Sequence, residues 1–212
     1  MSDTRQRLIE IAYERFGRNG FHAIGLDAII NEAGVSKQTF YNHFEGKDEL
    51  ILAVLNHRHE TESKLIQRLF KEKAGFDPRS RLYALIDVIE AWFNQPEWRG
   101  CIFVTAASEF PVRTEPAHQA AESHFSAFRE YLEELAANAG AAAPGRLADQ
   151  LMIVVEGLVS AKHVTGHERF NIAAKEIARS LLDRELPQVG ARRFSNQFES
   201  DENVRAAREV QQ

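Results

Sequence analysis

The chain of 212 residues contains a single cysteine and no long run of apolar residues. With Cys101 alone, no disulfide can form within the chain, and a lone thiol is typically a small buried side chain. The longest stretch free of Asp, Glu, Lys and Arg, from Leu135 to Gly145, has 11 residues, whereas a membrane-spanning helix needs about 20. The first residues are charged and include no apolar segment of a secretory signal. We therefore expect a cytoplasmic protein with no membrane partner.

The chain also lacks an excess of positive charge. Its net charge is −5, and residues 1–50 contain six Lys and Arg against eight Asp and Glu. An acidic chain is not attracted to nucleic acid as a whole, so DNA binding would require a local patch and specific hydrogen bonds. With 44% hydrophobic and 27% charged residues, the composition is that of an ordinary packed protein.

Motifs that position a catalytic nucleophile or a cofactor are missing from the sequence. It has no Gly-x-Ser-x-Gly elbow, no Gly-rich phosphate loop and no His-Glu-x-x-His. His163 and His167 are spaced for one helical face, and His57 and His59 offer further nitrogens, but no third and fourth ligand follow at a recognisable spacing. We expect no cofactor, no metal and no enzyme, although a catalytic group built from distant residues is an alternative.

Apolar residues recur three and four positions apart along nearly the whole chain, without sustained alternation of apolar and polar residues. This pattern predicts an all-α fold. The predicted helices cover about residues 3–16, 27–33, 37–44, 47–73, 77–95, 116–139, 147–166 and 172–186, with a short apolar segment at 101–110. The helix that starts at Lys47 would be about 40 Å long, enough to join two halves of a molecule.

These elements divide the chain into three predicted parts. Residues 1–46 would form a helical head, residues 47–186 a helical body, and residues 187–212 a polar tail. The mixed charge of the tail predicts mobility, although Phe194 and Phe198 could dock as one helical turn.

The segment from Leu151 to Val159 is apolar around almost its whole circumference. A helix of this kind must be covered on two sides, so we expect it to contact both its own core and a second subunit. The alternative is a central core helix. The predicted dimer contacts, in a four-helix bundle, are Leu151, Val154, Val155, Leu158, Ile177 and Leu181.

Two short predicted helices are joined by Gly34-Val35-Ser36, which is the pattern of a helix-turn-helix unit. Ser36 can cap the second helix and is also a predicted DNA-binding residue. On a helical wheel that starts at Lys37, Phe40 and Phe44 share the buried face.

The opposite face of this helix carries amide and hydroxyl groups, which can read base edges by hydrogen bonds. Flanking polar groups, and lysines at the starts of the third and fourth helices, can reach phosphates. A polar face turned to solvent is the alternative. The predicted base-reading residues are Gln38, Thr39 and Asn42, and the predicted phosphate contacts are Lys37, Tyr41, His43 and Lys47.

The run from Gly20 to Leu50 closely resembles the amino-terminal signature of TetR-type (tetracycline-repressor-like) transcriptional regulators. The resemblance is carried by Ala-Gly-Val-Ser-Lys-x-Thr-Phe-Tyr-x-His-Phe at residues 33–44, followed by Lys-Asp-Glu-Leu at residues 47–50. It implies a recognition helix at residues 37–44, with base-reading positions at Gln38 and Thr39. It also implies phosphate contacts at Tyr41, His43 and Lys47.

Two positions depart from the family pattern. The family often has a Thr followed by Ser or Thr before the second helix, where this chain has Ile24 and Gly25. A phosphate contact at this point would be missing or made by the backbone alone. Gly46 stands where the family has Ser or Asn, a weaker cap.

The resemblance further implies a homodimer with a DNA-binding head and a divergent ligand-binding body. Its expected function is that of a repressor on a palindromic DNA operator, released when a small organic ligand tilts the long fourth helix. An architectural protein that coats or bends DNA without sequence preference is the alternative.

A ligand pocket is expected among the middle helices, where aromatic residues are frequent. Ordinary core packing or solvated side chains are the alternative interpretation. The predicted ligand-binding residues are Trp92, Phe93, Cys101, Thr105, Glu109, His124, Phe125 and Phe128.

Overall fold

The computed structural model describes residues 3–96 and 98–187, and the predicted tail beyond Pro187, with Phe194 and Phe198, lies outside the described residues. The described part is all-α and contains no strand. Its helices are α1 (Asp3–Asn19), α2 (Leu26–Glu32), α3 (Lys37–Tyr41), α4 (Lys47–Ala74), α5 (Pro78–Tyr83), α6 (Leu85–Phe93), α7 (Ile102–Glu109), α8 (Pro116–Asn138), α9 (Pro144–Thr165) and α10 (Arg169–Glu185). None of these helices is long and apolar enough to span a membrane.

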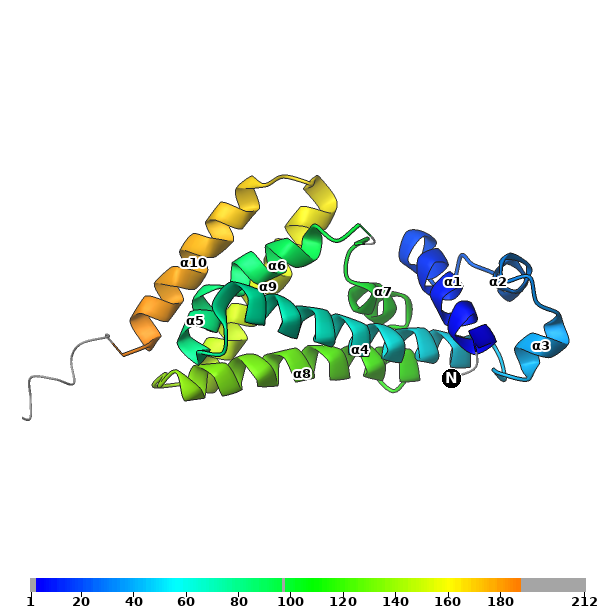
Figure 1. Cartoon of the computed structure of the whole chain (residues 1–212), viewed down its shortest axis with the longest axis horizontal. Helices are drawn as coiled ribbons and strands as arrows, with labels where there is room; N and C mark the ends of the chain where they lie inside the picture. The colour runs from blue at the N-terminus through cyan, green and yellow to red at the C-terminus, as the bar shows by residue number, and fades with distance from the viewer. Residues whose placement is uncertain (1–2, 97, 188–212) are drawn as a thin grey trace, which may run out of the picture.

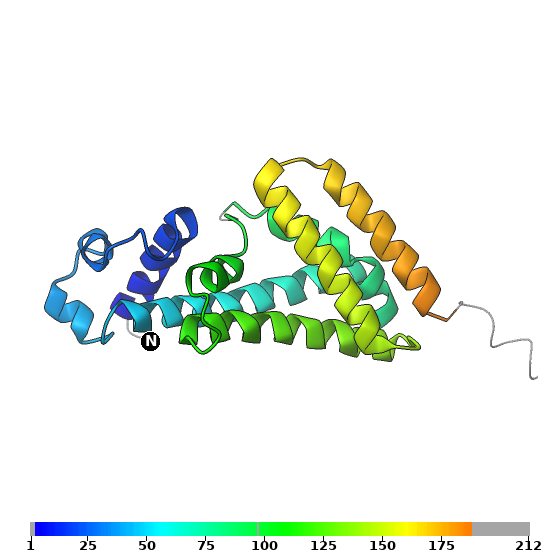
Figure 2. The same ribbon diagram turned by 180° about the vertical axis from the view of Figure 1, so that it is seen from behind.

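The molecule is elongated, with α1, α2 and α3 at one end (Figure 1). Helix α4 leaves this head and runs beside α8 into the body, where α5, α6, α9 and α10 gather (Figure 1). Seen from behind, α9 and α10 form an antiparallel pair on the outside of the body (Figure 2). The predicted long connecting helix is therefore confirmed.

Most helix boundaries follow from local sequence signals. Gly20 and Gly75, at the ends of α1 and α4, have φ of 80° and 67°, a left-handed backbone that glycine adopts most easily. Pro78 and Pro144 occupy first turns, where their missing N–H groups cost nothing.

The predicted helix ends lie within three residues of the observed ones, and two of the differences have a clear local cause. The predicted helix 77–95 is split into α5 and α6 at Ala84, whose N–H still bonds to the Ser80 carbonyl oxygen. Since the apolar period continues across this tight turn, the sequence gives no sign of the break. The predicted helix 37–44 ends early, at Tyr41, but the Phe44 N–H still bonds to the Phe40 carbonyl oxygen.

The buried apolar side chains form two clusters. The head cluster joins α1, α2, α3 and the first half of α4, and it also takes in α7 and the start of α8. The body cluster joins the second half of α4 with α5, α6, α8, α9 and α10. Phe103 of α7 and Ala121 of α8 belong to the head cluster, so a shift of these helices would change packing contacts in the head.

Candidate nucleic-acid interface and ligand cavity

The turn between α2 and α3 holds the exposed helix in place. Gly34 has a φ of 62°, and its N–H bonds to the Asn31 carbonyl oxygen. The N–H of Val35 bonds to the Ile30 carbonyl oxygen, so the end of α2 closes in a Schellman-like turn. Ser36 then caps α3, because its hydroxyl accepts a hydrogen bond from the Thr39 N–H at 3.0 Å.

Helix α3 turns its aromatic face inward and its polar face outward, as the helical wheel predicts. Phe40 and Phe44 are fully buried in the head cluster. Gln38, Tyr41 and Asn42 are exposed, and 53% of the Tyr41 surface is accessible. Among the other predicted contact residues, Ser36 and Lys37 are exposed, whereas Thr39, His43 and Lys47 are half-buried.

Some of these polar groups already have partners within the head. The Lys37 Nζ lies 2.8 Å from the Asp27 Oδ1, and this hydrogen bond and charge raise the pKa of Lys37. The Gln38 Nε2 donates to the Asn42 Oδ1 at 3.2 Å. Exposed pairs of this kind contribute little stability, so they can open when another partner is offered.

At both positions that depart from the family pattern, a helix begins without a side-chain cap. Gly25 is the N-cap of α2 and Gly46 is the N-cap of α4, and neither supplies a side-chain hydrogen bond. Just before α4, the Glu45 N–H donates to the Glu49 carboxylate at 2.6 Å, which ties the preceding loop to the first turn of the helix. The amide groups at these helix starts are left for solvent or a bound anion.

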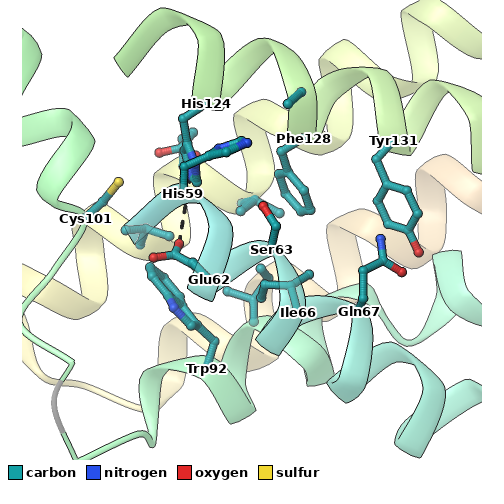
Figure 3. Close-up of a pocket in the computed structure, with 15 residues that line it drawn as sticks. His59, Glu62, Ser63, Ile66, Gln67, Trp92, Cys101, His124, Phe128 and Tyr131 are labelled. Atoms are coloured by element: carbon teal, nitrogen blue, oxygen red, sulfur yellow. Dashed lines mark hydrogen bonds and ion pairs between the residues drawn. The ribbon is translucent and has the colours of Figure 1, made fainter. Parts of the chain in front are cut away.

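A cavity of about 160 Å³ lies in the body between α4, α6, α8 and α9 (Figure 3). Four predicted ligand-binding residues line it, namely Trp92, Cys101, His124 and Phe128. Sequence reasoning missed a set of mostly polar wall residues: His59, Glu62, Ser63, Gln67, Tyr131 and Glu156.

The other four predicted ligand residues do not line the cavity. Phe93 is buried in the body cluster, and Phe125 packs on the head cluster. The Thr105 hydroxyl donates to the Cys101 carbonyl oxygen at 3.5 Å. Glu109 lies at the far end of α7, so it contacts the head instead.

A sequence signal for two of the missed residues does exist. Glu62 falls on the buried stripe of α4, between Leu55 and Ile66. Glu156 interrupts the apolar segment from Leu151 to Val159. A carboxyl within an apolar stripe is rarely buried without a partner or a function.

Charged and titratable groups are concentrated in one wall of the cavity (Figure 3). The Arg58 Nε lies 2.8 Å from the Glu62 Oε2, and the His124 Nε2 lies 3.9 Å from the Glu62 Oε1. The His59 Nδ1 lies 3.1 Å from the His124 Nδ1, and the His124 ring stacks on Phe103 with centroids 3.7 Å apart. The wall is thus connected to α7.

Burial dominates the acid–base behaviour of this wall. It raises the pKa of Glu62 to about 7 against the opposing effect of Arg58. Burial and the charge of Glu62 raise the pKa of Glu156 to about 7. The pKa of His124 falls to about 3, through burial and the charges of His59 and Arg58, so its ring is neutral at pH 7. Burial raises the pKa of the Cys101 thiol to about 12, which makes it unreactive.

Helix α7 connects the cavity to the head. Cys101 precedes it at the cavity, and Glu109 ends it at the loop after α1. The Glu109 carboxylate accepts hydrogen bonds from the Phe21 N–H at 2.9 Å and the His22 N–H at 2.7 Å. The His22 Nε2–H donates to the Glu109 carbonyl oxygen at 2.9 Å. The role predicted for Glu109, ligand binding, is therefore corrected to contact between body and head.

The predicted dimer contacts divide into buried and accessible residues. Leu151, Val155 and Leu158 are at most 3% exposed and belong to the body cluster of their own chain. Their burial within one chain leaves them unavailable to a partner, which corrects the prediction for these three residues. The other three predicted contacts remain accessible to different degrees: Ile177 on α10 is exposed, and Val154 and Leu181 are half-buried.

Sequence models of two protein families match the chain. "Bacterial regulatory proteins, tetR family" matches residues 8–54, and "Tetracyclin repressor-like, C-terminal domain" matches residues 78–177. Together they cover the head and most of the body.

Individual relatives agree with these matches. The transcriptional activator FasR of Mycolicibacterium smegmatis is 41% identical over 43% of this chain and 40% of its own. The transcriptional regulator LmrA of Bacillus subtilis is 26% identical over 62% of this chain and 70% of its own. The first three curated relatives are matched over 40%, 60% and 64% of their lengths, less than two thirds of each.

Solved structures extend the similarity to the whole fold. A TetR-family transcriptional regulator from Streptomyces coelicolor is 27% identical, with a TM-score of 0.79 over 87% of this chain and 97% of that chain. Reduced NemR of Escherichia coli has a TM-score of 0.72 over 84% of this chain and 97% of that chain, and at 20% identity it supports the fold alone.

Proposed function

Because the chain belongs to the TetR family of transcriptional regulators, we propose that it binds an inverted-repeat DNA operator as a homodimer. In this proposal a small organic molecule in the cavity releases the DNA. The family consists of transcriptional regulators, not enzymes. We propose repression, the family expectation, although FasR is named an activator. A regulator of chromosomal DNA would act in the cytoplasm.

The observation that carries the proposal is the polar outer face of α3. Gln38, Tyr41 and Asn42 are exposed on a helix that buried Phe40 and a capped turn hold rigidly. A rigid, exposed helix with amide side chains fits the major groove, where each base pair presents a distinct pattern of donors and acceptors. In the DNA complex, the Gln38–Asn42 hydrogen bond would be exchanged for bonds to bases.

Selection of genomic DNA fragments on the purified protein tests this proposal. Salt must be held fixed near the physiological range, because non-specific binding changes steeply with salt. We expect recovery of one inverted repeat whose half-sites are about one helical turn apart. Recovery of unsorted DNA alone would favour an architectural role.

The proposed dimer uses the outer faces of α9 and α10. Ile153 and Val164 on α9 are 73% and 77% exposed, and Ile172 and Ile177 on α10 are 63% and 52% exposed. Ile153 and Val164 share the outer face of α9, and with Ile177 on the neighbouring helix they offer exposed apolar side chains that a second copy can cover.

Ile177→Lys combined with Ile153→Lys is expected to convert the dimer into a monomer. In a two-fold symmetric interface each substitution occurs twice, so four charges would be buried or brought together. Light scattering measures the mass, and circular dichroism checks that the helices remain. Val112→Lys is the matched control, because Val112 is 56% exposed but lies in the loop between α7 and α8. A double variant that stays dimeric would place the interface elsewhere.

The release mechanism in this proposal acts through α4 and α7 together. Both helices have side chains in the head cluster, and both approach the cavity, α4 through Glu62 and α7 through Cys101 and Phe103. A ligand that binds better when these helices are displaced would favour a head position unsuited to DNA. Only its difference in affinity between the two positions can drive this change.

A further inference from the structure

We infer that the cavity binds a small aromatic amine in its protonated form, with the Glu156 carboxylate as its counter-ion. The inference rests on the proposed function, in which this cavity is the regulatory site. It concerns the chemical class of the ligand.

The size and walls of the cavity suit a single aromatic ring. Its volume is about 160 Å³, close to the roughly 150 Å³ of an engineered apolar cavity that takes up benzene. Trp92, Phe128 and Tyr131 supply aromatic surface, and Ile66 adds aliphatic surface (Figure 3). Val155 also lines the cavity. Aromatic faces also attract cations, by up to about 2 kcal/mol at desolvated sites.

The cavity wall contains two carboxyl groups, and only one of them is paired with a positively charged side chain. Glu62 on α4 is paired with Arg58 on the same helix. Glu156 on α9 is half-buried and has no hydrogen bond or ion pair to any described residue. The other titratable groups that line this space are His59 on α4, His124 and Tyr131 on α8, and Cys101 before α7.

Among the described residues, none of these groups forms a hydrogen bond or ion pair with Glu156. His124 is neutral at pH 7, and Arg58 already serves Glu62. An unpaired carboxylate in a buried site is unfavourable, so a ligand with one positive charge would remove this cost. An anionic ligand would instead face two carboxyl groups.

The cation is organic and not a metal ion. No group of three or more His, Cys, Asp or Glu side chains within residues 3–96 and 98–187 could hold a metal.

The cation and the proton compete for Glu156. Because a bound cation stabilises the carboxylate, it lowers the pKa of Glu156, and the carboxyl proton is released on binding. The affinity for the cation should therefore rise between about pH 6 and about pH 8. A neutral ligand would show no such rise.

The test compares benzylamine, benzyl alcohol and benzoate, which share one ring and differ in charge, by calorimetry on the full chain. We expect benzylamine to bind about tenfold more tightly than benzyl alcohol near pH 8, with benzoate the weakest. Glu156→Gln should abolish this preference. Glu60→Gln should keep it, because Glu60 is exposed on α4 and does not line the cavity. Circular dichroism checks that both variants fold.

The outcomes separate the ligand class from the regulatory role. Equal binding of benzyl alcohol and benzylamine, a preference that survives in Glu156→Gln, or no binding of benzylamine would each overturn the inference. Release of the selected operator is measured in parallel with each compound. Charge-selective binding without release of DNA would support the inference and contradict the regulatory role of the cavity.

Discussion

Replacing Glu109 with alanine is expected to lower the free energy of unfolding by about 2 kcal/mol. The carboxylate accepts hydrogen bonds from the backbone N–H groups of Phe21 and His22. A hydrogen bond to a charged group contributes about 1.5–3 kcal/mol when buried, and partial exposure of this site reduces that value. Amide hydrogen exchange at Phe21 and His22 should accelerate about thirtyfold, the equivalent of the same free energy.

Glu115→Ala is the matched control for this variant. The Glu115 carboxylate also accepts a backbone hydrogen bond, from Val112 at 3.2 Å, but it does so within its own loop. We expect a loss below about 0.5 kcal/mol there. Unchanged exchange at Phe21 and His22 in Glu109→Ala would show that α7 does not hold the head.

A substitution at Gly20 tests the contact between Glu109 and the loop after α1 in a second way. A Cβ atom at this position would lie 2.3 Å from the Glu109 Oε1, and the φ of 80° is itself unfavourable for alanine. Gly20→Ala should therefore be destabilising, and the clash should disappear when Glu109 is also alanine. Losses smaller than additive in the double variant would confirm that the two residues act through one contact.

Glu156→Gln is expected to stabilise the protein at about pH 8 by roughly 1–3 kcal/mol and to leave its stability at about pH 4 unchanged. In the folded chain the pKa of Glu156 is raised from 4.5 to about 7, first by burial and then by the charge of Glu62. The native state is thus penalised whenever this carboxyl is ionised. Glutamine keeps nearly the same shape and cannot ionise.

The sign of this effect follows from proton binding. Between about pH 4.5 and pH 7 the folded chain holds a proton on Glu156 that the unfolded chain has already released. Stability therefore falls as the pH rises through this range, and the full penalty is present above about pH 7. Urea unfolding at both pH values measures the difference, with Glu60→Gln as the control on an exposed carboxyl. Equal effects of Glu156→Gln at both pH values would contradict this explanation.

The orientation of α3 could be predicted from the sequence because it depends on local rules. The spacing of Phe40 and Phe44 fixes the buried face, and Ser36 and Gly34 fix the start of the helix. The helix ends at Tyr41 and not at the predicted Phe44, but this difference does not move these side chains to another face.

The cavity and the proposed dimer surface are harder to predict, because they depend on how distant helices pack. Periodicity identified aromatic residues of the body, but it could not tell Trp92, which lines the cavity, from Phe93, which fills the core. Similarly, the apolar segment of α9 packs Leu151 and Val155 inward and leaves Ile153 outside. The sequence also does not reveal that α7 reaches the head, so it gives no indication that Glu109 contacts the loop after α1.

The central claim is that the outer face of α3 reads base sequence. The most direct measurement is the affinity of Gln38→Ala for the selected inverted repeat and for a scrambled duplex, at one fixed salt concentration. Loss of a base contact costs about 1–3 kcal/mol, so we expect about ten- to a hundredfold weaker binding to the repeat and unchanged binding to the scrambled duplex. Lys47→Ala should instead weaken both, as a phosphate contact would. Equal affinities of wild type and Gln38→Ala for the repeat, or equal losses on both duplexes, would contradict the claim.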